Sequence, residues 1–310
     1  MGLISWIKSK YYDHKLNIAD NQLAKGNIEK AEDIFRTLLG KQHDAVIHLA
    51  KLYVTNSNSK ELKIKRLRQI EDLKEFVDVL HSSDYQKELN SHVFNIYQLA
   101  QQVFNSKDYS GAVSLIDSIR KYRSEQSEYQ DRDHRYKAYL FFSNSQTQSN
   151  YSSELANCTR ELGLIKNSKE SDIRNIQQQL LSQKRFVRTI NLLLPFKSIN
   201  SDFKNSLIDC ILQTISNNDC EIKNLKKISD ICTDAEIASL AARESTSRAT
   251  QLASKSRYAE AVSFDTFAAE FLSNDNKFNY SRCTHILEEL GSRANHSEIS
   301  KLFSLATQLN

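Results

Sequence analysis

Apolar residues recur along this chain at spacings of three and four, with polar residues between them. The clearest runs are Ile96, Leu99, Ala100 and Val103, then Ile173, Ile176 and Leu180. This spacing places the apolar side chains on one face of a helix, and that face is stable only when it packs against another element. The pattern therefore predicts a series of amphipathic helices.

A short sequence motif, called the repeated phrase below, recurs at the junctions between these helices. It consists of a polar turn, an aromatic residue or Ile, two variable residues and a small residue. The copies are Ile28 with Ala31, Tyr109 with Ala112, Phe186 with Thr189, Tyr258 with Ala261, and a degenerate form at Tyr151. Adjacent copies recur at roughly the period of helix-pair repeats. We therefore predict about seven helix pairs in a single array over residues 1–310.

Glycine and proline are scarce, which narrows the choice of fold. The 310 residues include 6 glycines and one proline, Pro195. Tight β-hairpins and dinucleotide-binding loops need glycine for positive φ angles, and long loops collect proline. A β-sandwich or a doubly wound α/β fold is therefore excluded, and helices joined by short Asn, Ser and Asp turns remain.

The phrase and the helix before it resemble the tetratricopeptide (TPR) repeat. The match is clearest over 12–45, 93–126 and 242–275, and weaker over 135–168 and 170–203. The small residues fit a close crossing of two helices, since large side chains there would keep the helices apart. The resemblance implies an all-α fold, a right-handed α-α superhelix in the manner of a TPR solenoid.

Both ends of the chain depart from the repeat. Residues 2–12 predict a basic amphipathic helix that contains Trp6, the single tryptophan. This helix either caps the first repeat or docks on a partner or a membrane surface. Residues 281–309 predict a final pair of helices whose polar face caps the stack.

Sequence signatures of catalysis and of bound cofactors are absent. There is no P-loop, GxGxxG, GxSxG or HExxH motif, so we expect no enzyme activity, no cofactor and no metal. The five cysteines are widely spaced without a CxxC pair and predict reduced core residues in a cytoplasmic protein. No apolar run is long enough to span a membrane.

The resemblance also implies where a partner binds. In TPR proteins the first helix of each repeat lines a concave groove, and its non-packing positions face the ligand. The groove candidates carried over to this chain are Phe94, Tyr97, Gln101, Asn105, Tyr136, Tyr139, Ser143, Arg174, Gln178 and Arg243. The alternative for the aromatic residues among them is packing between repeats.

A groove of aromatic and amide side chains suits an extended peptide or a helix of another protein. The expected function is therefore a non-enzymatic scaffold or adaptor for protein–protein interaction. One alternative is RNA binding, because basic and aromatic side chains on helical repeats also suit single strands. Another is a regulatory or sensor subunit of a larger multiprotein system. The net charge, +4 from 42 basic and 38 acidic residues, is too small to indicate nucleic acid by itself.

Overall fold

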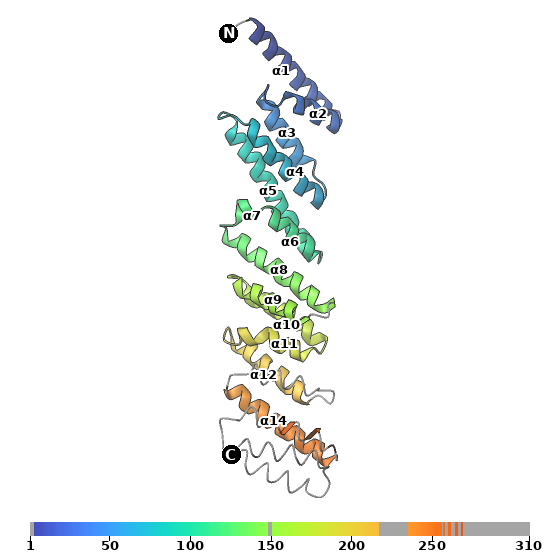
Figure 1. The fold of residues 1–310 in the computed structure, drawn as a ribbon, viewed down its shortest axis with the longest axis vertical. Coiled ribbons are helices and arrows are strands. Elements are labelled where there is room, and N and C mark those ends of the chain that lie inside the picture. Colours follow the sequence, from blue (N-terminus) through green and yellow to red (C-terminus); the bar gives the residue numbers. More distant parts are fainter. Residues whose placement is uncertain are drawn as a thin grey trace. The chain divides into compact units, whose positions relative to one another are not determined.

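The structure is a computed structural model that describes residues 3–147, 151–216 and 235–255, with residues 257, 260–261, 264–265 and 268. Within these ranges all regular secondary structure is helical, which confirms the all-α prediction (Figure 1). The helices of the first half are α1 (Leu3–Ala24), α2 (Ile28–Leu38), α3 (Asp44–Thr55), α4 (Lys60–Asp72), η1 (Leu73–Phe76), α5 (Ser82–Asn105), α6 (Tyr109–Ser118), α7 (Arg120–Arg123) and α8 (Ser127–Thr147). Those of the second half are α9 (Tyr151–Leu164), α10 (Lys169–Ser182), α11 (Phe186–Leu193), η2 (Leu194–Phe196), α12 (Ser201–Ser216) and α14 (Ala235–Ser254).

The polar turn has the same backbone conformation in three copies of the repeated phrase. Gly26, Lys107 and Lys184 each lie two residues before the second helix of a pair, with positive φ angles of 76°, 67° and 54°. At Gly26 the turn is closed by the amide of Asn27, which donates to the carbonyl of Gln22 at 2.9 Å. Equivalent bonds close the other two turns. This is the Schellman arrangement, which satisfies the last carbonyl groups of the first helix and reverses the chain.

The helices pack as tandem pairs. Within a pair α1 contacts α2, α3 contacts α4, α5 contacts α6, and α10 contacts α11. The first helix of the next pair also packs on the pair before it: α5 contacts both α3 and α4, α12 contacts α11, and α14 contacts α12. This stacking is that of a TPR-like helical solenoid, because each pair covers the apolar face left open by its neighbour.

The contacts divide the chain into two compact units. Unit 1 comprises residues 1–144 and 164–166, and unit 2 comprises 145–163 and 167–310. The single continuous array that the sequence predicts stays a prediction, as does its right-handed superhelical path.

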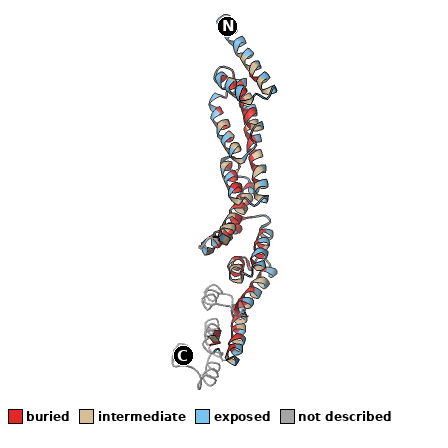
Figure 2. Cartoon of the chain, turned by 90° about the vertical axis from the view of Figure 1, so that its right-hand side faces the viewer, coloured by how far each residue is buried: buried red, intermediate tan, exposed pale blue. Residues whose placement is uncertain are grey.

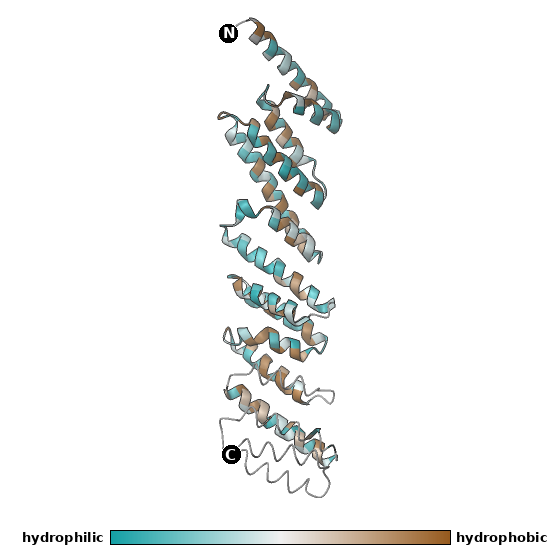
Figure 3. Cartoon of the chain, viewed as in Figure 1, coloured by the Kyte–Doolittle hydropathy of each residue, from teal (hydrophilic) through white to brown (hydrophobic). Residues whose placement is uncertain are grey.

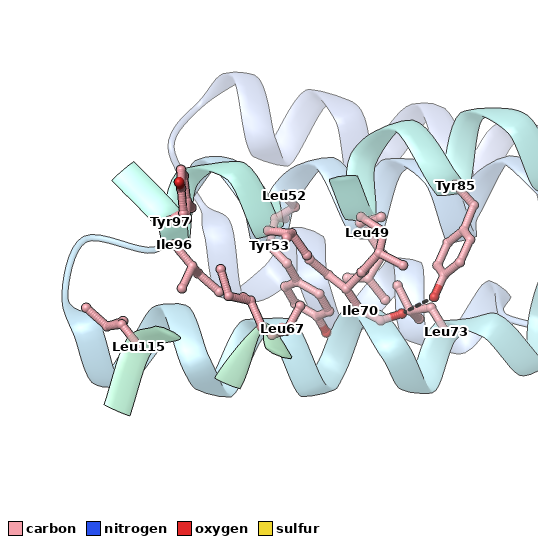
Figure 4. Close-up of a cluster of buried hydrophobic side chains, with 14 of the residues drawn as sticks. Leu49, Leu52, Tyr53, Leu67, Ile70, Leu73, Tyr85, Ile96, Tyr97 and Leu115 are labelled. Atoms are coloured by element: carbon pink, nitrogen blue, oxygen red, sulfur yellow. Dashed lines mark hydrogen bonds between the residues drawn. The ribbon is translucent and has the colours of Figure 1, made fainter. Parts of the chain in front are cut away.

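The core of unit 1 fills the space between successive helix pairs. Alanines 19, 31, 50, 100 and 112 are fully buried where helices cross, as the close-crossing argument requires. Large side chains such as Tyr53, Leu67 and Ile96 occupy the spaces beside them (Figure 4). The buried Tyr85 hydroxyl donates to the carbonyl of Ile70 at 2.9 Å. Buried residues follow the inner faces of the helices, and exposed residues follow the outer faces (Figure 2).

Two helices extend beyond the windows that the sequence predicted, and the repeat bounds themselves stay predictions. The N-terminal segment 2–12 is not a separate helix: it continues into the first repeat as the 22-residue α1. Helix α14 begins at Ala235, before the predicted repeat start at residue 242. The predicted capping helices 281–309 lie outside the described residues. No helix in the described ranges is both long and apolar enough to cross a bilayer.

Candidate functional site

Three of the predicted groove residues share one exposed face of α5. Phe94 is 48% exposed, Asn105 is exposed and Gln101 is half-buried. Positions separated by four, seven and eleven residues lie close together around a helix, so Gln86 and Asn90 belong to the same face. We call Gln86, Asn90, Phe94, Gln101 and Asn105 the α5 stripe. All five lie in unit 1.

The amides of the α5 stripe form two hydrogen-bonded pairs on either side of Phe94. Gln86 Nε2 donates to Asn90 Oδ1 at 3.1 Å. Gln101 Nε2 donates to Asn105 Oδ1 at 3.0 Å. Each bond uses one donor and one acceptor, while an Asn or Gln amide offers two donors and two lone pairs. The stripe therefore holds its amides in a defined orientation and keeps hydrogen-bonding capacity for a ligand.

An open hollow of about 750 Å³ extends the α5 stripe at its N-terminal end. Its lining consists of Val79, Ser82, Ser83, Gln86, Lys87 and Asn90. Val79 is 92% exposed, and Leu80 beside it is also exposed. The surface thus combines amide and hydroxyl groups, one charged side chain at Lys87, and an apolar side chain at each of two places, Val79 and Phe94.

Three predicted groove residues prove to be buried, which corrects our expectation for their side chains. Tyr97, Tyr136 and Tyr139 are buried, and the half-buried Phe104 lies against two of them. The Tyr136 ring stacks on Phe104 with centroids 4.5 Å apart, and Tyr139 meets the same ring edge-on at 5.1 Å. These aromatics join α5 to α8, which is the packing alternative that the sequence left open.

The buried tyrosines nevertheless support the α5 stripe. The Tyr136 hydroxyl donates to Gln101 Oε1 at 3.2 Å and so fixes the direction of that amide. The Arg132 guanidinium lies over the Tyr97 ring, 4.2 Å from its centroid. Burial raises the pKa of Tyr97 to about 12 and also raises the pKa of Tyr136, so both hydroxyls stay protonated at neutral pH. Ser143, further along α8, is half-buried.

The remaining candidates lie in unit 2. Arg174 and Gln178 line an open hollow of about 600 Å³ on α10. The Arg174 guanidinium already pairs with Glu170 at 3.0 Å and Asp202 at 2.8 Å. Its charge is therefore neutralised by two carboxylates, which weakens it as a receptor for an acidic ligand. Arg243 is exposed on α14.

Sequence reasoning missed the N-terminal half of the α5 stripe. The predicted repeat starts at residue 93, so Gln86, Asn90 and Val79 precede the window in which the repeat places its groove positions. The available signal was the spacing of Gln86 and Asn90, eight and four residues before Phe94, on an uninterrupted helical pattern.

The described side chains include no metal-binding group: no three His, Cys, Asp or Glu residues among them are arranged to hold an ion. The buried thiols Cys158 and Cys210 belong to the core. Burial raises the pKa of the Cys210 thiol to about 12, which keeps it protonated and unreactive. The other cysteines, at 220, 232 and 283, lie outside the described residues.

Comparison with known proteins adds little to this picture. No protein-family model matches the chain, and no curated protein matches it. Among solved structures, the TPR domain of P58(IPK) aligns with 96% of this chain and 98% of its own, at 12% identity and a TM-score of 0.20. At that TM-score the two backbones do not superimpose, and the similarity says nothing about a binding site or a partner.

Proposed function

We propose that this protein is a non-enzymatic interaction scaffold that binds an extended peptide segment of another protein along the α5 stripe. One observation carries the proposal: the exposed Phe94 ring lies between two hydrogen-bonded amide pairs, Gln86–Asn90 and Gln101–Asn105. An exposed aromatic ring supplies rigid apolar contact area, which is typical of the residues that dominate binding energy.

The amides suit a peptide in extended conformation. Such a peptide presents unpaired N–H and C=O groups along its length, and both kinds pair with Asn and Gln side chains. From Gln86 to Asn105 the stripe measures roughly 28 Å at the rise of an α-helix, enough for about eight residues of extended chain. A docked helix has its backbone groups satisfied internally, so it would leave the amides of the stripe unused.

The five residues of the stripe are uncharged, so their own contacts with a ligand rest on hydrogen bonds and apolar contact; the nearby charged side chains are Lys87 in the hollow and Arg132 over the Tyr97 ring. Binding of this kind changes little with ionic strength, whereas binding to a nucleic acid weakens steeply as salt rises. Two basic side chains near the start of α11 are engaged within the protein. Arg185 donates to Gln146 at 2.7 Å, and Arg188 donates to the carbonyl of Ser145 at 3.0 Å. We therefore propose a protein partner.

Affinity capture from a lysate of the native cells tests this function. The bait proteins are the tagged full chain, the double variant Asn90→Ala/Phe94→Ala, and Ile199→Ala as a control. Ile199 is exposed to a similar extent as Phe94 but lies after η2, outside unit 1. All three substitutions are at the surface, so each protein should keep its helical circular dichroism and melting temperature.

The expected result is a protein captured by the wild type and by Ile199→Ala, and reduced roughly tenfold or more with the double variant, as for loss of a central aromatic contact. Capture by the wild type should persist when the salt concentration is raised. Equal recovery of the same proteins with all three baits would show that the α5 stripe is not the binding surface.

A further inference from the structure

The first three turns of α1 extend beyond the rest of unit 1. Helix α1 has 22 residues and its partner α2 has 11, so α2 covers only the C-terminal half of α1. Ala19 in that half is fully buried, and Asp13 accepts a hydrogen bond from Gln42 at 2.8 Å. We call residues 3–12, which precede this tether, the α1 tip; Figure 1 shows its projection past α2.

The α1 tip exposes large apolar side chains to solvent. Ile4, Trp6, Ile7 and Tyr11 are between 52% and 72% exposed. The sequence left two alternatives open, a cap on the first repeat and a docking helix, and this exposure favours the docking helix. A cap buries its apolar face, whereas these four large apolar side chains within three helical turns are exposed, and exposed apolar groups of this kind mark interaction sites.

Polar and apolar side chains are arranged around the tip as in a helix that lies on a membrane. Ile4, Ile7 and Tyr11 are spaced by three and four residues and share one face. The exposed Lys8 and Lys10 lie beside that face, and residues 3–12 contain no acidic side chain. The brown and teal positions at the start of α1 in Figure 3 show this mixture.

We propose that the α1 tip binds the surface of a lipid bilayer that contains anionic lipids, with the helix lying in the plane of the interface. Trp and Tyr side chains favour the headgroup level, where the ring is buried and its polar end stays hydrated. Lysines beside the apolar face pair with anionic headgroups and extend their ammonium groups to the water. This surface is separate from the α5 stripe and does not depend on the scaffold function.

The positive charge of the α1 tip favours a lipid bilayer over a second copy of the chain as its binding partner. In a symmetric dimer through the tip, Lys8 and Lys10 of one copy approach the same lysines of the other, with no acidic residue in the segment to compensate. Like charges brought together across an interface oppose association. An anionic lipid surface instead matches both the apolar side chains and the two positive charges.

Sedimentation of the full chain with lipid vesicles tests the proposal. The vesicles are phosphatidylcholine alone, or phosphatidylcholine mixed with phosphatidylserine. The variant Lys8→Gln/Lys10→Gln removes two charges from the tip. The matched control Lys25→Gln/Lys30→Gln removes two exposed lysine charges further along the first helix pair. A third variant, Trp6→Ser/Ile7→Ser, removes exposed apolar side chains and leaves the buried half of α1 intact.

We expect binding to the mixed vesicles that weakens by about fivefold for each tip lysine removed. The Lys25/Lys30 control should bind as the wild type does, and Trp6→Ser/Ile7→Ser should not bind. Because Trp6 is the single tryptophan, its emission reports the tip directly. The emission should shift to the blue with mixed vesicles and stay red-shifted in buffer.

Three outcomes would overturn the proposal. The first is no sedimentation with either kind of vesicle. The second is equal sedimentation with neutral and mixed vesicles, or equal loss with the two lysine variants, since either result removes the role of the tip charges. The third is a blue shift of Trp6 emission that depends on protein concentration without lipid, which assigns the tip to a second copy of the chain.

Discussion

At the scale of single residues, His81 joins two turns of unit 1. Its Nδ1 lies 2.6 Å from Asp78 Oδ1 and its Nε2 lies 2.9 Å from Asp44 Oδ1. The His43 ring stacks against it, and His43 Nδ1 is 3.5 Å from Asp78 Oδ2. The hydrogen bond with Asp78 raises the pKa of His81 despite partial desolvation, and the contact with Asp44 adds to the effect. This cluster holds the segment that leads to Val79 and the hollow.

The His81 cluster predicts a pH dependence of stability. Because the folded pKa of His81 is raised above its unfolded value, its contribution is fully present below the unfolded pKa, about 6.5. The contribution is lost as pH rises through the raised folded pKa. Urea unfolding of the wild type and of His81→Asn should therefore differ most below about pH 6.5, and the two should converge at higher pH. A constant difference across this range would contradict the prediction.

The burial of individual side chains could be predicted from the sequence only in part. The family resemblance gave Phe94, Gln101 and Asn105 as groove candidates, and in the structure the three lie on one face of α5. The resemblance could not indicate that α8 covers Tyr97, nor that Tyr136 and Tyr139 fill the space around Phe104. Whether an aromatic side chain is a binding residue or a packing residue depends on the neighbouring pair of helices, and one sequence does not place that pair.

At the scale of elements, the repeated phrase is explained by its turn. A left-handed residue ends the first helix, and the next residue donates back across the turn. Glycine adopts this conformation without strain, but side chains with a Cβ do so at a cost. The chain has glycine at position 26 and lysine at positions 107 and 184, so the lysine turns are less stable than glycine would make them.

We predict that Lys184→Gly raises the free energy of unfolding by about 0.5–1 kcal/mol, because relief of left-handed strain exceeds the added entropy of the unfolded chain.

Gly26→Ala should lower the free energy of unfolding by about 1 kcal/mol. The added Cβ has no steric neighbour, but alanine is disfavoured at the φ of 76° that this position adopts. Chemical denaturation of both variants measures the two effects. A destabilised Lys184→Gly protein would contradict the turn assignment.

Element boundaries show the same division between what local patterns reveal and what they do not. The ends of α2, α5 and α10 next to the polar turns follow from capping and turn residues in the sequence. The continuity of α1 through residue 12 also agrees with a local signal that the predicted boundary at residue 12 did not use, since no Gly or Pro lies between residues 3 and 24 to mark a break. The helix simply continues while each residue can extend it, and only the length of α2 reveals that its first turns are uncovered.

At the scale of the whole molecule, the described contacts form two units, and both proposed surfaces belong to unit 1. The scarcity of Gly and Pro and the recurring phrase were enough to predict an all-α protein of stacked helix pairs. They were insufficient to predict two units, since this division depends on how strongly neighbouring pairs contact one another. Together, the two proposals describe a protein that holds a peptide on the α5 stripe and rests on an anionic membrane through the α1 tip.

The central claim is that the α5 stripe binds an extended peptide, and an equilibrium titration tests it most directly. A peptide selected on the full chain from a random library would be labelled and titrated by fluorescence anisotropy with the wild type, Asn90→Ala/Phe94→Ala and Ile199→Ala. We predict a Kd at least about tenfold higher for the double variant, or about 1.4 kcal/mol. The Kd should be unchanged for Ile199→Ala and nearly independent of salt. An equal Kd for all three proteins would contradict the account.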